Sequence, residues 1–248
     1  EHFRPLHFFM VAREAPHVCL RRNSRSQFKE DMKLLPFLQQ VPPCERVFVE
    51  LGALDGIQGS NTLMLERCFG WSGLLIEASP ASFERLQASG RKAYIAHSAI
   101  CRGHGTVGIH EGGVWSTEAE VMDSKYMRLA AHYGTNISTR PVAVPCRSLT
   151  SLMGSAGLAH AAFLSLDVQG VEDKVLEAVD PAVFSLVLVE MDGTNRAKDL
   201  RVERRLMQSG FKYANATLNW IFASRAFVKN NSEWAEPTSR YLLARAGR

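Results

Sequence analysis

Four acidic residues each end an apolar run, and this regularity is the most informative chemical feature of the chain. Short apolar runs that alternate with helix-like stretches are typical of buried parallel strands. The carboxyl ends of parallel strands meet at one edge of a sheet, where ligands bind, so we expect the carboxylates to share one cleft. Carboxylates there can accept hydrogen bonds from ribose hydroxyls or remove a proton from a substrate. The four acids are Glu50, Glu77, Asp167 and Glu190.

The turn after the first run indicates which ligand the cleft takes. Gly52 follows the first acid almost at once, and Asp55 with Gly56 completes a G-x-x-D-G turn. Dinucleotide-binding enzymes carry G-x-G-x-x-G at this place, where it holds a pyrophosphate. The different turn favours S-adenosylmethionine, a nucleoside without phosphate, over NAD.

Residues around this turn have predicted roles in holding the nucleoside. Glu77 can accept hydrogen bonds from both ribose hydroxyls, and Gly52 allows the backbone to approach the ligand where a Cβ would clash. Asn61 and Thr62, at the start of a helix, can donate to the methionyl carboxylate. Ser98 is expected beside the adenine. These patterns predict a cofactor-binding set of Glu50, Gly52, Asp55, Gly56, Asn61, Thr62, Glu77, Ala78, Ser98, Ala99 and Asp167.

Composition and charge are those of a globular α/β domain. The chain has 248 residues, 46% of them apolar, which is enough for one large domain with a core. The formal net charge of +4 arises without a dense Lys/Arg block, so the sequence shows no strong nucleic-acid signal. No apolar stretch reaches the length of a membrane span. A nucleic-acid-binding class and a membrane-spanning class are therefore disfavoured.

The alternation of strands and helices predicts a mostly parallel, seven-stranded sheet with helices on both faces. The rhythm breaks at about 103–145, where an inserted β-rich region with a helix at 124–132 is expected. We divide the chain into an N-terminal arm and helix (1–45), a main domain (46–225) and a tail (226–248), with residues 1–23 extended. Helices are predicted at 26–40, 61–69, 80–90, 148–158, 171–179 and 197–210, and strands at 46–53, 74–77, 92–100, 162–168, 184–190, 211–216 and 220–224.

Cysteines and glycosylation sequons bear on the compartment. The cysteines are widely spaced, odd in number and form no C-x-x-C, which argues against a zinc knuckle and a dense disulfide scaffold but leaves one or two bridges open. N-x-[ST] sequons at Asn136, Asn215 and Asn230 favour a lumenal history. The sequence begins with Glu rather than Met, so an organellar or secretory-pathway lumen is among the expected locations. The five cysteines are Cys19, Cys44, Cys68, Cys101 and Cys146.

The order and spacing of several motifs resemble the FkbM family of S-adenosylmethionine-dependent methyltransferases. Ser26-Gln27 with Asp31 is similar to the Ser-Gln…Asp segment of the family, and this likeness adds Gln27 to the cofactor-binding set. The resemblance covers about residues 24–225. It implies a class I methyltransferase fold and methylation of a hydroxyl on a sugar, glycan or small metabolite. The other motifs are FVELGALDG at 48–56, SNT at 60–62, WSGLLIE at 71–77, SAI at 98–100 and LDVQGVE at 166–172, followed by Val175 and Leu176.

Two positions depart from the family pattern. The family usually has Asp-Val-Gly at the first strand end, and this chain has Glu50-Leu-Gly, which keeps a carboxylate. The Asp-x-Glu-Gly element appears as Asp167-Val-Gln169-Gly170, which loses one. That loss leaves a metal or base role at the second element open, and we predict no metal site.

An alcohol acceptor benefits from a general base, and four residues are candidates. Asp167 is preferred because it should lie beside the transferred methyl group; its alternative role is to bind the amino group of the cofactor. Glu190, His97 and the more distant Glu172 are the others, with plain packing as the alternative for His97. A function of another class also stays open: a catalytically silent methyltransferase-fold subunit of a larger complex, docking through the N-terminal arm and the C-terminal tail.

Overall fold

A parallel sheet forms the centre of the computed structural model, which describes residues 15–122, 124–191, 195–218 and 223–229. The order of its strands is β10-β11-β9-β8-β1-β2-β3, with neighbouring strands hydrogen-bonded. Five of them are parallel, and β11 and β10 are added antiparallel beside β9. The strands are β1 (Val47–Leu51), β2 (Ser72–Glu77), β3 (Tyr94–His97), β8 (Phe163–Leu166), β9 (Leu186–Met191), β10 (Phe211–Leu218) and β11 (Ala223–Lys229). The predicted α/β fold with a parallel sheet is confirmed.

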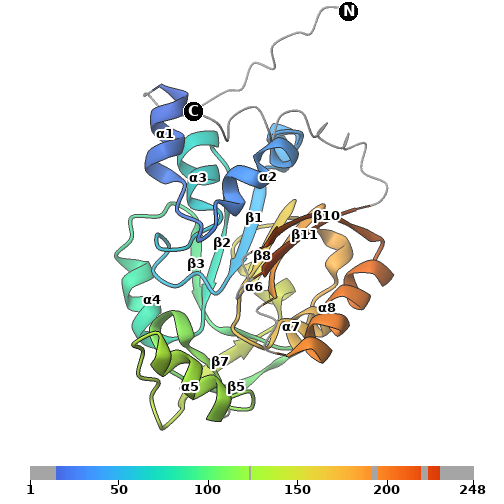
Figure 1. Ribbon diagram of the computed structural model, residues 1–248. Coiled ribbons are helices and arrows are strands. Elements are labelled where there is room, and N and C mark those ends of the chain that lie inside the picture. The colour runs from blue at the N-terminus through green and yellow to red at the C-terminus, as the bar shows by residue number, and fades with distance from the viewer. Residues whose placement is uncertain (1–14, 123, 192–194, 219–222, 230–248) are drawn as a thin grey trace, which may run out of the picture.

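Helices cover both faces of this sheet, as expected for strands that are apolar on both sides (Figure 1). Phe48 of β1 packs into the cluster formed with α1, α2, α3 and α4, whereas its neighbour Val49 packs into the cluster with α6, α7 and α8. The sheet is thus the middle of three layers. The helices are α1 (Pro16–Asn23), α2 (Glu30–Leu38), α3 (Leu63–Phe69), α4 (Pro80–Gln87), α6 (Leu149–Ser155), α7 (Glu172–Ala178) and α8 (Arg196–Gln208), with short 3-10 turns at Pro43–Glu45, Gly113–Trp115 and Pro181–Val183.

A second, smaller sheet lies between β3 and α6 in the chain. It has the order β4-β7-β5-β6 and is mostly antiparallel. The helix α5 (Ser124–His132) connects β6 to β7. Its strands are β4 (Ala99–Ile100), β5 (His104–His110), β6 (Thr117–Glu118) and β7 (Val142–Arg147).

The single third strand predicted at 92–100 is wrong. The chain leaves the main sheet after His97 and enters the second sheet at Ala99. Ser98 makes the junction, since its buried hydroxyl contacts the carbonyls of Ala99 (2.7 Å) and Pro145 (3.2 Å). Periodicity cannot show this change of sheet, because both pieces are β-like.

The N-terminal predictions also need correction. Residues 16–23 of the predicted extended arm form α1, and the helix predicted from residue 26 begins at Glu30. Ser26 is held outside the helix because its hydroxyl donates to Asp31 Oδ1 (2.6 Å), and Lys29 adopts a left-handed conformation (φ 63°). Residues 1–14 of the arm lie outside the described residues.

The C-terminal boundary lies later than predicted. Strand β11 continues to Lys229, past the end of the main domain expected at residue 225. The predicted strand at 220–224 overlaps residues 219–222, and most of the predicted tail is 230–248; both ranges lie outside the described residues.

Two disulfide bonds link elements that are far apart in the sequence. Cys19 of α1 is bonded to Cys68 of α3, and Cys101 is bonded to Cys146 of β7. Cys44 is an exposed free thiol. Asn136, the sequon asparagine whose side chain the structure describes, is exposed. Among the described helices, none is long and apolar enough to cross a membrane.

Candidate active site

A cavity of about 630 Å³ opens at the carboxyl ends of the parallel strands. It lies where the strand order reverses between β1 and β8, the usual ligand position in such sheets. Its volume is in the range of cavities that hold a cofactor-sized molecule. Its walls include the ends of the strands, residues 58–61 of the loop after β1, residues 113–118 of the second sheet region, and residues 25–27 before α2.

Glu77, at the end of β2, is buried and lines this cavity. The backbone N–H of Leu54 donates to its Oε2 (2.7 Å), and the N–H of Ser79 donates to its Oε1 (2.7 Å). Burial raises the pKa of Glu77 to about 7, against the lowering effect of these backbone donors. The carboxylate is therefore bound directly to the β1–α3 loop, and each of its oxygens already accepts one hydrogen bond.

Glu50, at the end of β1, organises the same loop from beneath. Its Oε1 accepts from the N–H of Asn61 (2.8 Å), and its Oε2 accepts from the hydroxyls of Ser60 (2.9 Å) and Thr62. Desolvation raises the pKa of Glu50, and the nearby guanidinium of Arg91 opposes that shift. The carboxylate is thus occupied by protein donors, although the residue lines the cavity.

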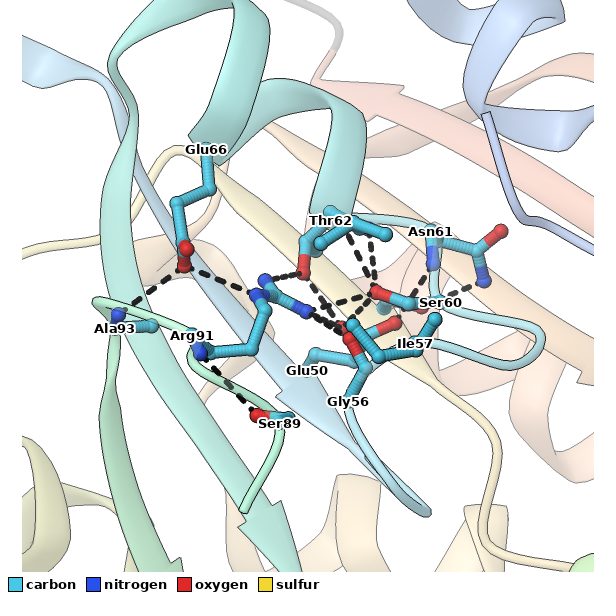
Figure 2. Close-up of polar contacts among 12 residues, drawn as sticks. Glu50, Gly56, Ile57, Ser60, Asn61, Thr62, Glu66, Ser89, Arg91 and Ala93 are labelled. Carbon is cyan, nitrogen blue, oxygen red and sulfur yellow. Dashed lines mark hydrogen bonds and ion pairs between the residues drawn. The ribbon is translucent and has the colours of Figure 1, made fainter. Parts of the chain in front are cut away.

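Arg91 is a buried cation that the sequence analysis did not single out. Figure 2 shows its guanidinium between α3 and the β1–α3 loop. It donates to Glu66 Oε2 (3.0 Å), to the Gly56 carbonyl (2.6 Å) and to Thr62 Oγ1 (2.9 Å), and its side chain has 0% exposure. It lies 3.9 Å from Glu50 Oε2. One arginine therefore ties together the loop and the two buried carboxylates behind it.

Gly52 brings the end of β1 against the end of β8. The residue has φ +77°, and a Cβ added to it would lie 1.7 Å from the carbonyl oxygen of Asp167. The expected reason for this glycine was close approach to a ligand. The nearest obstacle is instead the backbone of Asp167, so glycine is required for the two strand ends to meet.

Asp167 and Glu190 end two adjacent parallel strands, and Gln169 connects them. The amide nitrogen of Gln169 donates to Asp167 Oδ1 (2.8 Å) and to Glu190 Oε2 (2.9 Å). Its Oε1 accepts from the Tyr126 hydroxyl (3.3 Å), and its backbone carbonyl accepts from Thr117 (2.7 Å). A glutamate, as in the family pattern, has no amide hydrogens to share between two carboxylates. Both acids and Gln169 line the cavity.

Most of the predicted residues meet at this cavity, and five do not line it. His97 lies behind the strand ends, where its Nε2 contacts the Ala78 carbonyl (3.0 Å) and its ring stacks on Phe83. Thr62 is fully buried beneath the loop. Asp55 accepts from the N–H groups of Ile57 and Gln58 within its own turn. The predicted residues that line the cavity are Gln27, Glu50, Gly52, Asn61, Glu77, Ala78, Ser98, Ala99, Asp167 and Glu190; those outside the lining are Asp55, Gly56, Thr62, His97 and Glu172.

Two aromatic residues of the second sheet region also line the cavity. Trp115 is buried, and its ring stacks on the half-exposed ring of Tyr133 (centroids 5.6 Å apart). Tyr126 packs edge-on against Trp115 and lies outside the lining. Tyr133 carried no sequence signal beyond its place in the inserted region.

The sheet, the glycine turn and the row of strand-end carboxylates define an α/β enzyme with a Rossmann-like nucleoside site. The chain belongs to the FkbM methyltransferase family, because the model of the Methyltransferase FkbM domain matches residues 50–213. It is therefore an S-adenosylmethionine-dependent methyltransferase. A search of curated proteins found no match to this chain.

Solved structures of methyltransferases are similar to the chain at low sequence identity. The precorrin-6y C5,15-methyltransferase of Geobacter metallireducens is 9% identical, with 91% of this chain and 93% of that chain covered and a TM-score of 0.38. The METTL16 methyltransferase domain is 7% identical, with 82% and 67% covered and a TM-score of 0.48. An O-methyltransferase of Bacillus cereus in complex with SAH is 13% identical, with 88% and 93% covered and a TM-score of 0.38.

The cavity residues fit the cofactor of this family. Asn61 Oδ1 is buried and has no hydrogen-bond partner among the described residues, while its Nδ2 donates to Ser165 Oγ (3.0 Å). A buried acceptor without a donor is costly unless a ligand supplies one. The amino group of the methionyl moiety is such a donor. Glu77, on the other side of the loop, offers carboxylate oxygens to a ribose.

Proposed function

We propose that this methyltransferase transfers the methyl group to a hydroxyl of a sugar or another small metabolite. The observation that carries the proposal is the pair of carboxylates, Asp167 and Glu190, held together by Gln169 in the wall of the cavity. A hydroxyl is a weak nucleophile and gains from a base that takes its proton. A carboxylate pair at the methyl-transfer end of the cavity supplies that base.

The proposed cofactor contacts follow from the same geometry. Glu77 accepts hydrogen bonds from the ribose hydroxyls, and Asn61 Oδ1 accepts from the methionyl amino group. Ser98 and Ala99 lie next to Glu77 in the lining and are assigned to the adenine side. Glu50 and Thr62 act indirectly, because their side chains bind each other beneath the loop that carries Asn61.

The protein has to supply only a base and the correct positioning of the two reactants. S-adenosylmethionine supplies a methyl carbon already activated by a positively charged sulfur. The acceptor oxygen bonds to that carbon while the carbon–sulfur bond breaks, and Asp167 takes the hydroxyl proton. Gln169, which also donates to Glu190, holds the Asp167 carboxylate in place, and the cavity walls exclude water from the reacting groups.

The residues on the acceptor side of the cavity favour an acceptor that is an uncharged ring. Tyr133 is about half-exposed and lines the cavity beside Trp115, so its ring can stack on a sugar. Most of the charged residues that line the cavity are acidic: they include Glu118 as well as the four strand-end acids. A phosphorylated or carboxylated acceptor would be repelled by this surface.

The test uses S-adenosylmethionine labelled in its methyl group and a panel of methyl glycosides, free sugars and small amino and thiol compounds. We expect label on oxygen, as alkali-stable methyl ethers. Asp167→Asn should lower turnover by about 10²- to 10⁴-fold while binding of S-adenosylhomocysteine stays within about twofold. Label found only on nitrogen or sulfur acceptors, or unchanged turnover of the Asp167→Asn variant, would reject the proposal.

The alternative of a catalytically silent subunit rested on docking by the N-terminal arm and the C-terminal tail. Both segments fall largely within residues 1–14 and 230–248, outside the described residues. No described contact favours that alternative.

A further inference from the structure

The segment between α1 and α2 forms a wall of the cavity, and a disulfide joins the helix before this segment to α3. Arg25, Ser26 and Gln27 line the cavity next to residues 58–61 of the β1–α3 loop. The contact is direct, since Ser26 and Gly59 form a parallel β-bridge. Asn61, the proposed partner of the methionyl amino group, is two residues after Gly59. Residues 25–27 therefore lie beside the proposed position of the methionyl group.

Arg25 is the sole Lys or Arg among the residues that line the described cavity. The same lining contains Glu50, Glu77, Glu118, Asp167 and Glu190. S-adenosylmethionine carries a carboxylate at its methionyl end, and this group would meet an acidic surface without a balancing cation. A guanidinium can bind a carboxylate through two parallel hydrogen bonds. Arg25 is therefore the lining residue of the described cavity that can offer a cation to this carboxylate.

One disulfide and three hydrogen bonds fix the segment from behind. Cys19 and Cys68, both buried, join α1 to α3, the helix that follows the β1–α3 loop, and Figure 1 shows these two helices side by side. The buried amide of Asn23 donates to the Cys19 carbonyl (2.9 Å). The hydroxyls of Ser24 and Ser26 both donate to Asp31 Oδ1 (2.9 and 2.6 Å). The disulfide is the covalent member of this set.

We propose that Arg25 binds the methionyl carboxylate and that the Cys19–Cys68 disulfide is the positioning element that presents it. The inference rests on the proposed cofactor position at the ends of β1 and β2. Without the disulfide, α1 is held to α3 by noncovalent packing alone, and the segment that carries Arg25 loses its fixed end. Disulfides persist in oxidising compartments, so full cofactor affinity belongs to the oxidised protein.

The experiment compares two ligands that differ only in the part Arg25 should bind. S-adenosylhomocysteine has the amino-acid end, and 5′-methylthioadenosine lacks it. Calorimetric titration of the full chain should show that Arg25→Ala weakens S-adenosylhomocysteine about tenfold or more and leaves methylthioadenosine within about twofold. Arg21→Ala, an exposed arginine of α1 outside the cavity, is the matched charge control and should change neither.

The disulfide is tested in the same assay. Cys19→Ala/Cys68→Ala should lose preference for S-adenosylhomocysteine over methylthioadenosine, whereas Cys101→Ala/Cys146→Ala, which removes the other disulfide, should keep it. Circular dichroism checks that the variants fold. If the Cys19→Ala/Cys68→Ala variant does not fold, the Arg25→Ala variant still tests the contact between Arg25 and the carboxylate.

The outcomes separate the two proposals. Wild-type protein that binds neither ligand refutes the proposed function. Wild-type protein that binds both, with Arg25→Ala losing affinity equally for both or for neither, overturns the role of Arg25. A folded Cys19→Ala/Cys68→Ala variant with wild-type preference overturns the positioning role.

Discussion

Gln169 donates a hydrogen bond from Nε2 to Glu190 Oε2 at 2.9 Å, although the two residues belong to the ends of different strands. The second hydrogen of the same amide is donated to Asp167. One neutral side chain thus separates two carboxylates that would otherwise repel each other. The departure from the family's Asp-x-Glu-Gly element has a structural consequence, because an amide can donate to both acids and an ionised glutamate can donate to neither.

Replacing Gln169 by glutamate should disable the base. Gln169→Glu places a third carboxylate between Asp167 and Glu190, removes both hydrogen bonds and adds like-charge repulsion among the three groups. We expect turnover to fall at least about tenfold and the acid limb of its pH profile to move to higher pH. The profile is measured between pH 5 and 9. Gln208→Glu, the same change on the exposed side of α8, is the control, and an unchanged profile for Gln169→Glu would contradict the bridging role.

Arg91 should be among the most costly residues to remove. Arg91→Met leaves Glu50 and Glu66 buried without their cation, and breaking such a pair typically costs about 3–5 kcal/mol of unfolding free energy. Urea unfolding at pH 7 measures it. The control is Arg102→Met, whose 3.9 Å ion pair with Glu177 is exposed and whose loss should cost less than about 1 kcal/mol. Equal losses for the two variants would show that Arg91 does not hold the loop.

Cofactor affinity should depend on pH through Glu77. The pKa of its carboxyl is raised from 4.5 to about 7, and ribose hydroxyls donate best to the ionised form. Binding of S-adenosylhomocysteine should therefore tighten as pH rises from 6 to 8, by about tenfold for a single group, and level off above. Glu77→Gln should remove this dependence. A wild-type affinity that stays constant over this range would argue against Glu77 as the ribose ligand.

The raised pKa of Glu77 also affects the stability of the fold, which should fall, rather than rise, as the pH increases. The folded protein holds the Glu77 proton more tightly than the unfolded chain, so this group contributes stability below pH 4.5 and loses it as pH rises toward 7. Relative to wild type, Glu77→Gln should gain stability as pH rises from 5 to 8. Urea unfolding of both proteins across that range measures the unfolding free energy of Glu77→Gln minus that of wild type. If this difference stays constant or falls with pH, burial does not destabilise the ionised carboxylate.

Gly52 should not tolerate a side chain. Gly52→Ala places a Cβ against the Asp167 carbonyl and requires a left-handed backbone from alanine, so we expect a loss of at least about 2 kcal/mol in stability and weaker cofactor binding. Gly105→Ala is the control, because a Cβ there meets no atom within 4 Å. Thermal unfolding of the two variants measures the loss of stability. Equal melting temperatures would show that the backbone of Asp167 does not exclude a side chain at residue 52.

The strand ends were predictable because they depend on local sequence. Buried parallel strands read as apolar runs, and the acid after each run marks where the backbone leaves the sheet, as at Glu50 and Glu77. The glycine turn was predictable for the same reason. Family motifs added Gln27, which comes well before the strand-end residues in the sequence but lines the same cavity.

Other features depend on contacts that no local pattern records. Arg91 follows a helix-ending glycine and reads as an exposed loop residue, yet it is buried because Glu66 of α3 and the Gly56 carbonyl surround it. His97 looked like a base at a strand end, but its ring turns onto Phe83. The change of sheet at Ser98 depends on β7, which comes much later in the chain.

A crystal structure of the chain with S-adenosylhomocysteine bound tests the central claim most directly. Our account predicts the ribose hydroxyls within hydrogen-bonding distance of Glu77 and the methionyl amino group at Asn61 Oδ1, with the sulfur directed toward Asp167. A nucleoside bound elsewhere, or one bound in the cavity with its ribose turned away from Glu77, would contradict it.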